Sequence, residues 1–169
     1  MVKTIFIFLF VLIFGNETKA HLQSDSTIVY AFLSTECPMC IAYTPVLNQI
    51  AADYKNTPVK VVGVFPNFYT TDSLVAEYQK SYPIDFEIII DSHLELTNRF
   101  DATITPEVFV VKNGQVLYKG LIDNAYFRPG KRRGKTSEYY LRAALSAITF
   151  NKEPLLPFTT TIGCAIVKN

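Results

Sequence analysis

The sequence predicts an α/β sandwich built around a mixed β-sheet. Two observations lead to this. Apolar, β-prone runs alternate with helix-like patterns over residues 27–100, and a hairpin signal over 107–120 is followed by an amphipathic helix. A length of 169 residues suits one domain, and neither a repeat nor a second-domain boundary is visible.

The first half of the chain alternates strands with helices. Residues 27–33 are nearly all apolar, which is typical of a central strand covered on both faces. A helix is expected over 38–54, with a kink at Pro45. The remaining predicted elements are a strand over 59–64, a helix to Ser81 capped by Thr71 or Asp72, a strand over 86–90, and a short helix to Phe100 capped by Asp91 or Ser92.

The second half predicts a hairpin and a last helix. Two β-rich runs, 107–112 and 116–120, are joined at Asn113-Gly114, a pair typical of tight hairpin turns. An apolar stripe predicts a helix over 137–148. The basic, glycine-rich stretch 130–135 between them is expected to be a solvated loop, the alternative being a docking site for an acidic partner.

The N-terminus has the pattern of a secretory signal peptide. Lys3 precedes an unbroken apolar run over 5–14, which is too short to span a bilayer as a helix. Small residues at Thr18 and Ala20 predict cleavage after Ala20, leaving a domain over 21–169. An uncleaved membrane anchor is the alternative. Export, to a bacterial periplasm or otherwise to the exterior, would place the cysteines where disulfides persist.

Charge and composition exclude several classes of protein. The 16 basic and 15 acidic residues nearly cancel, so the chain has no electrostatic field to collect nucleic acid. With 49% hydrophobic residues it is too apolar to be disordered. Three cysteines are too few for a disulfide scaffold, and the odd number leaves at least one without an internal partner.

The chemistry is predicted at Cys37-Pro-Met-Cys40, where a strand gives way to a helix. A helix N-terminus favours an anion, and the thiolate is the reactive form of cysteine. Pro38 suits the first helical position because it has no N–H to leave unpaired. Cys40, one turn later, is placed to resolve a mixed disulfide formed at Cys37. We therefore expect Cys37 to be an exposed nucleophile and Cys40 a more buried thiol.

The cysteine pair has two other interpretations. A structural zinc site needs about four ligands, and Cys164, His93 and His21 do not supply a second paired spacing. A purely structural disulfide across two residues is also possible. A strand–CxxC–helix arrangement in an α/β pattern favours a redox motif, with no metal and no cofactor beyond a redox-active Cys37–Cys40 disulfide.

These residues resemble the thioredoxin superfamily. The CxxC after a strand, a proline eight positions after Cys37 (Pro45), and Thr105-Pro106 before the hairpin all match its pattern. The resemblance implies a three-layer sandwich in which the Thr105-Pro106 bond is cis and lies against the cysteines. It also implies that the Thr105 backbone pairs with a substrate as an added strand would. The alternative is an ordinary proline at the start of a strand.

The long interval between Cys40 and Pro106 leaves room for an inserted β/α element. Together with 33–40, 102–111, 120–124 and 160–166, it makes the chain similar to the redoxin branch, which includes envelope thiol–disulfide proteins and peroxiredoxin-like proteins.

The chain departs from the family pattern near the site. Glu36 replaces the usual tryptophan, and a carboxylate beside Cys37 would disfavour the thiolate. Ala31 stands where a buried acid usually assists the second cysteine, so Glu36 or Glu107 is the candidate for proton transfer. The Pro-x-x-x-Thr-x-x-Cys motif of true peroxiredoxins is absent, since Tyr30 stands at its proline position and Ser34 at its threonine position.

The remaining candidates lie outside the motif. Cys164 is either a buried structural thiol or a third redox thiol that pairs with Cys37 or with a partner. His93 is expected at the surface rather than as a ligand.

The predicted function is exported thiol–disulfide exchange, catalysed by Cys37 and Cys40, with Thr105 and Pro106 binding the substrate. Its partners would be protein or small thiols and disulfides and a redox partner protein, without nucleic acid or stable membrane insertion. Two alternatives remain: a thiol-dependent peroxidase, and a non-enzymatic copper- or thiol-handling protein for metalloprotein maturation.

Overall fold

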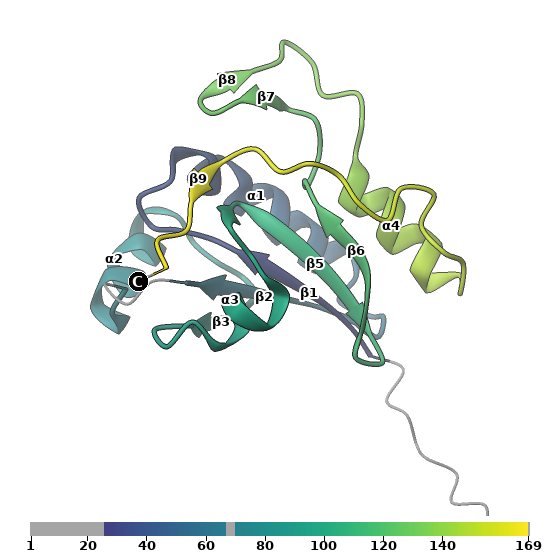
Figure 1. The fold of residues 1–169 in the computed structure, drawn as a ribbon, viewed down its shortest axis with the longest axis horizontal. Coiled ribbons are helices and arrows are strands. Elements are labelled where there is room, and N and C mark those ends of the chain that lie inside the picture. Colours follow the sequence, from purple (N-terminus) through teal and green to yellow (C-terminus); the bar gives the residue numbers. More distant parts are fainter. Residues whose placement is uncertain (1–25, 67–69, 169) are drawn as a thin grey trace, which may run out of the picture.

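The computed structural model describes residues 26–66 and 70–168, and a five-stranded mixed sheet forms its centre (Figure 1). The strand order is β3-β2-β1-β5-β6, with bounds β1 Thr27–Phe32, β2 Val59–Phe65, β3 Glu87–Ile90, β5 Glu107–Lys112 and β6 Gln115–Gly120. Strands β1, β2 and β3 are parallel, whereas β5 and β6 are antiparallel to their neighbours. The predicted signal peptide, 1–20, and His21 lie outside the described residues.

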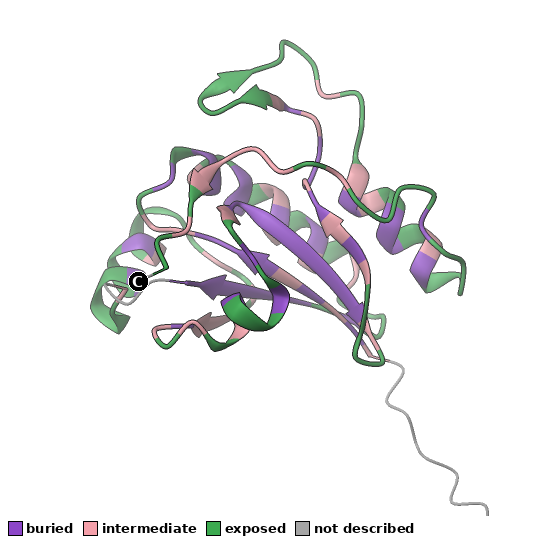
Figure 2. Ribbon diagram, in the orientation of Figure 1, coloured by how far each residue is buried: buried purple, intermediate pink, exposed green. Residues whose placement is uncertain are grey.

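Helices cover both faces of the sheet and make it the middle of three layers. Apolar side chains of α1 (Pro38–Asp53), α2 (Asp72–Ser81) and α4 (Tyr140–Thr149) share one core with Val29 and Ala31 of β1. Phe100 of α3 (Glu95–Phe100) packs with Phe32 in a second core on the opposite face. The alternation of β1 side chains between two cores confirms that it is a central strand. Figure 2 shows buried residues (purple) along the central strands.

The predicted elements are confirmed to within a few residues. Thr71 caps α2 by accepting the Leu74 N–H, and Asp91 accepts the N–H groups of Leu96 and Thr97 at the start of α3. Asn113 and Gly114 both have positive φ, 54° and 78°, as a two-residue hairpin turn requires. Helix α1 runs without interruption through Pro45.

Four short strands were not predicted. They are β4 (Ile104–Thr105), β7 (Tyr126–Arg128), β8 (Lys131–Arg132) and β9 (Cys164–Ala165). The pair β7–β8 makes part of the predicted basic loop a small hairpin, whose residues in β8 are exposed as expected. Strand β9 pairs antiparallel with β4 in a two-stranded sheet separate from the central one, so residues 164–165 lie beside the two residues that precede Pro106.

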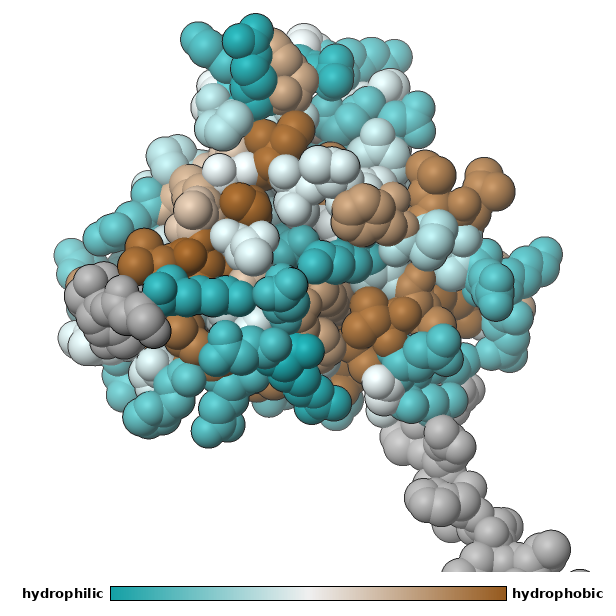
Figure 3. Space-filling view, viewed as in Figure 1, coloured by the Kyte–Doolittle hydropathy of each residue, from teal (hydrophilic) through white to brown (hydrophobic). Residues whose placement is uncertain are grey.

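The C-terminal segment, defined here as residues 157–166, reaches β9 along the edge of the sheet. Its backbone pairs with β6 at Lys119, which donates to Pro157 O (3.0 Å) and accepts from Thr159 N (3.0 Å). In Figure 1 the segment crosses from α4 to the start of α1 (yellow). Figure 3 shows exposed apolar groups near α4, where Leu155, Leu156 and Phe158 are among the exposed large side chains. Within the described residues, no helix is both long and apolar enough to span a membrane.

Candidate active site at the start of α1

The end of β1 and the start of α1 place Cys37 at a helix N-terminus. Cys37 is the N-cap residue with extended backbone angles, Pro38 occupies the first turn, and the Ile41 N–H donates to Cys37 O (3.1 Å). The predicted position of the cysteine is therefore confirmed. The first-turn N–H groups and the helix dipole favour a thiolate at this sulfur when it is not bonded.

Cys40 lies one turn further and is fully buried. Its Sγ accepts a hydrogen bond from the Ser34 N–H at 3.3 Å. Burial raises the pKa of the Cys40 thiol to about 12, although the Ser34 N–H and the Thr105 side chain oppose this shift. The prediction that Cys40 is a buried thiol is confirmed.

The Thr105-Pro106 peptide bond is cis, as the resemblance implied. It lies between β4 and β5, and Thr105 O is 3.5 Å from the Cys37 sulfur. Residues 68 positions apart are thus brought together at one end of the sheet.

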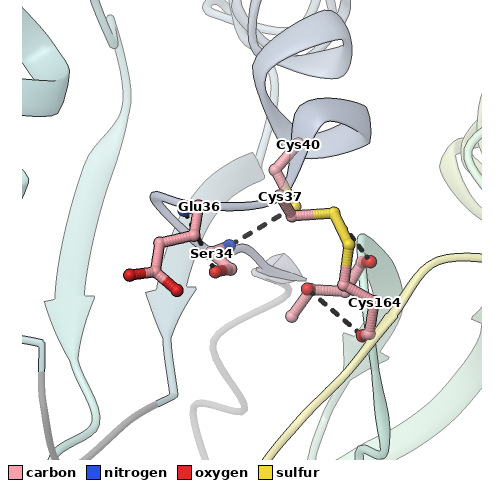
Figure 4. Close-up of a disulfide and its surroundings, with 6 residues drawn as sticks. Ser34, Glu36, Cys37, Cys40 and Cys164 are labelled. Atoms are coloured by element: carbon pink, nitrogen blue, oxygen red, sulfur yellow. Dashed lines mark hydrogen bonds between the residues drawn. A yellow bond between two sulfur atoms is a disulfide. The ribbon is translucent and has the colours of Figure 1, made fainter. Parts of the chain in front are cut away.

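Cys37 is bonded to Cys164 in this structure, while Cys40 is a free thiol (Figure 4). The expected Cys37–Cys40 disulfide is therefore not the one present. Of the interpretations left open for Cys164, pairing with Cys37 is the one that appears. Their Cα atoms are 6.2 Å apart, within the usual range for a disulfide, although 127 positions separate them in the sequence.

The expectation that Cys37 would be exposed is wrong for this form of the protein. Only 1% of Cys37 is accessible, because Cys164 and the C-terminal segment cover it. Cys164 is partly exposed and borders an open cavity of about 220 Å³. The cavity lining comprises Ser34, Glu36, Cys37, Pro66, Thr105 and 164–167. A molecule entering from solvent therefore meets the disulfide from the Cys164 side.

The two candidate proton-transfer residues are placed differently from each other. Glu36 is exposed, and its carboxylate extends away from the disulfide (Figure 4). Glu107 is only 2% exposed and follows Pro106 directly.

The Glu107 side chain faces away from Cys40. Neighbours Val108 and Val110 belong to the core that contains Cys40, whereas Phe109 belongs to the core on the opposite face. Because side chains alternate along a strand, Glu107 shares the face of Phe109. Its Oε1 accepts from Thr161 Oγ1 (3.3 Å) and lies 3.9 Å from Lys119 Nζ. Glu107 thus contacts the C-terminal segment. Among the described residues it makes no hydrogen bond to Cys40, so no direct contact supports its predicted role in proton transfer to Cys40.

Burial also sets the protonation of Glu107. Desolvation raises its pKa, against the attraction of Lys119 and the hydrogen bonds from the Thr103 backbone and Thr161. Its Oε2 is buried without a hydrogen-bond partner. His93 is exposed in the turn before α3, and the described residues contain no group of three or more histidine, cysteine or acidic side chains able to hold a metal.

A family comparison matches this arrangement. The Redoxin family model matches residues 15–126, well over half of the chain. The chain belongs to the redoxin family. The matched range includes both cysteines of the CxxC motif and the cis proline, but it ends before α4 and the C-terminal segment. Cys164 therefore lies outside the part of the chain that matches the family model.

Solved structures share the fold of this redoxin. A hypothetical protein from Sinorhizobium meliloti is 27% identical, with a TM-score of 0.73 over 85% of this chain and 80% of that one. An uncharacterized conserved protein from Geobacillus kaustophilus is 22% identical, with a TM-score of 0.75 over 87% and 79%.

A further neighbour has a functional name. A putative thiol:disulfide interchange protein DsbE from Chlorobium tepidum is 22% identical, with a TM-score of 0.52 over 57% of this chain and 68% of that one. The fold is thus a thioredoxin-like three-layer sandwich with an inserted β/α element. No curated protein matched the sequence.

Proposed function

We propose that this redoxin is an exported thiol–disulfide oxidoreductase in which Cys37 is the nucleophile and Cys40 the resolving thiol. The observation that carries the proposal is that Cys37, Cys40 and the cis Thr105-Pro106 peptide bond lie together at the start of α1. Cys37 begins α1, Cys40 follows one turn later with its sulfur held by the Ser34 N–H, and the cis Thr105-Pro106 bond lies against Cys37. This is the arrangement that dithiol exchange requires.

The reaction needs only the cysteines. The Cys37 thiolate attacks one sulfur of a substrate disulfide, forms a mixed disulfide and expels the other sulfur as a thiolate. Cys40, after losing its proton, attacks Cys37, forms a Cys37–Cys40 disulfide and releases the substrate as a thiol. The substrate gains two electrons and two protons, and the enzyme loses them. The reverse sequence oxidises a dithiol substrate.

Thr105 and Pro106 are proposed to hold the substrate beside Cys37. The β4 backbone is a strand edge within reach of the reacting sulfur, and extended peptides bind such edges by adding a strand. The signal-peptide pattern supports export, and a thiol:disulfide interchange name among the structural neighbours is consistent with thiol or disulfide partners. A periplasmic or secreted location completes the proposal, because disulfides persist there.

The test is reduction of insulin disulfides by the pre-reduced protein. The wild type should turn over with dithiothreitol as the electron source, Cys37→Ser should lose turnover, and the double variant Cys40→Ser/Cys164→Ser should accumulate a mixed disulfide. Unchanged turnover in Cys37→Ser would overturn the proposal. The Cys37–Cys40 reduction potential then sets the direction. A value of roughly −270 mV indicates a reductant, and one of roughly −120 mV an oxidant.

A further inference from the structure

The C-terminal segment occupies the strand edge assigned above to substrate. Cys164 faces Thr105 and Ala165 faces Ile104 in the antiparallel β4–β9 ladder, and Ile166 N donates to Thr103 O at 2.8 Å. The cysteine of this added strand is disulfide-bonded to Cys37. The segment therefore has the geometry of a peptide substrate captured as a mixed disulfide.

Glycine at position 163 makes the close approach possible. A Cβ added at Gly163 would overlap the carbonyl oxygen and carbon of Thr105. These two Thr105 atoms belong to the backbone beside the cis bond, so they cannot move aside as the end of a flexible side chain could. Any chain that binds here in the same register needs a glycine immediately before its cysteine.

Specific contacts hold the segment in place upstream of the cysteine. Thr159 Oγ1 accepts the Leu121 N–H at 2.8 Å and lies 3.0 Å from the Tyr118 hydroxyl. Thr161 donates to the buried Glu107. Downstream of the cysteine, Ala165 and Val167 are exposed beside the open cavity. Ile166 packs against the second core and Lys168 pairs with Asp101 (3.4 Å), so the chain is held on both sides of Cys164.

We propose that the β4 edge binds an extended peptide whose disulfide-bonded cysteine follows a glycine, and that the C-terminal segment is a tethered occupant of this groove, released from Cys37 by Cys40. The proposal rests on the proposed function. It goes further by naming the substrate sequence class and by giving Cys164 a place in the cycle.

The release step is balanced within the molecule. Cys40 loses its proton and attacks the Cys37 sulfur, so that a Cys37–Cys40 bond forms as the Cys37–Cys164 bond breaks. Cys164 leaves as a thiolate and takes up a proton from solvent, which has received the proton of Cys40. No external oxidant or reductant is needed. The product is the open form, in which the Cys37–Cys40 disulfide can accept a substrate thiolate at the β4 edge. Before Cys37 can attack a substrate disulfide, a dithiol donor must first reduce this form, taking up its oxidising equivalents as a disulfide.

Two matched peptides test the substrate class on the full-length, pre-reduced wild type. Their sequences are Thr-Ile-Gly-Cys-Ala-Ile and Thr-Ile-Ala-Cys-Ala-Ile, each carrying nitrothiobenzoate on its cysteine. Cys37 attacks the peptide sulfur and expels the coloured thiolate. The glycine peptide should react faster by about tenfold or more, because the alanine methyl group meets Thr105. Both peptides should react equally with free dithiothreitol.

The outcomes separate the two proposals. Equal rates for the two peptides, both well above the rate with Cys37→Ser, would overturn this inference and leave the proposed function in place. Rates no greater than with Cys37→Ser would overturn the proposed function itself.

A variant of the chain tests the tethered occupant. Gly163→Ala should shift the equilibrium in the oxidised protein from Cys37–Cys164 toward Cys37–Cys40 by about tenfold. Gly134→Ala is the control, since nothing lies within 4 Å of a Cβ added there. The two disulfides are distinguished by tryptic mapping of the mature protein, because Cys37 and Cys40 share the peptide 21–55 and Cys164 lies in 153–168. An unchanged ratio would contradict the proposal.

Discussion

Thr105 and Cys164 face each other in the ladder between β4 and β9, and the peptide bond that follows Thr105 is cis. This relationship joins the end of the chain to the reactive end of α1, because Cys164 is also bonded to Cys37. A buried free thiol, Cys40, lies one helical turn away. Three cysteines with one disulfide among them provide the means for an internal exchange.

The rate of the internal exchange should rise with pH. Only the thiolate of Cys40 attacks, and burial raises the pKa of this thiol to about 12. In the oxidised wild type, the rate at which Cys37–Cys164 converts to Cys37–Cys40 should therefore increase about tenfold for each pH unit between about pH 7 and 10. Acid quenching, alkylation and tryptic mapping give the rate. Cys40→Ser should show no conversion at any pH, and a pH-independent rate in the wild type would contradict the assignment.

Glu107 should make stability depend on pH in a defined direction. Its pKa is raised above 4.5 in the folded protein, so the folded state binds this proton more tightly than the unfolded state. The resulting stabilisation is fully present below about pH 4.5 and is lost as the pH rises through the raised pKa. Gln at 107 remains neutral throughout. The melting temperature of Glu107→Gln, relative to the wild type, should therefore increase between about pH 4 and 8.

The exposed Glu36 provides the control for this measurement. Glu36→Gln changes the same chemical group near the same site, but at the surface. Because the Glu36 side chain is exposed, this variant reports how far removal of a carboxylate at the site changes the melting temperature without an effect of burial. A Glu107→Gln difference that stays constant across the range would show that the Glu107 carboxylate does not titrate as described.

The hydroxyl of Tyr43 should stabilise the fold. It donates to Asp123 Oδ1 at 2.5 Å, and the same oxygen accepts the Ala125 N–H at 2.8 Å. Both side chains are buried, so Tyr43→Phe leaves a buried carboxylate with one donor fewer. The cost should be about 1–3 kcal/mol in the free energy of unfolding, measured by urea denaturation. Tyr139→Phe is the control, because the Tyr139 hydroxyl is exposed; equal losses in the two variants would contradict this role.

Gly120 should be essential for docking the C-terminal segment on β6. Its φ is 139°, and an added Cβ would overlap the backbone and hydroxyl of Thr159. Gly120→Ala should lower the free energy of unfolding by about 1–3 kcal/mol, through displacement of the segment and backbone strain. Gly134→Ala, where the space is open, should change it little. Comparable stability of the two variants would argue against tight docking at this point.

The sequence predicted the sheet and helices well because those elements have strong local patterns. The apolar run of β1, the Asn113-Gly114 turn and the cap at Thr71 each depend on neighbouring residues alone. The same holds for Cys37 at the start of α1, which local helix chemistry places correctly.

The parts of the site that were missed depend on distant contacts. Strands β4 and β9 have two residues each, too few for a periodic pattern, and they form only because they pair with each other. The burial of Cys37 follows from the arrival of Cys164 from 127 positions away. Gly163, next to Cys164, is a local sign that the backbone comes close to another segment there. The sequence alone does not show that this segment is Thr105.

The most direct test of the central claim is a trapping measurement on the double variant Cys40→Ser/Cys164→Ser, treated with oxidised glutathione. Without a resolving thiol, Cys37 should accumulate one glutathione in mixed disulfide, at a rate above that of free cysteine, as read by intact mass and tryptic mapping. Cys164→Ser alone should resolve the adduct to a Cys37–Cys40 disulfide. Absence of an adduct on Cys37, or formation no faster than on free cysteine, would contradict its assignment as the nucleophile of a thiol–disulfide oxidoreductase.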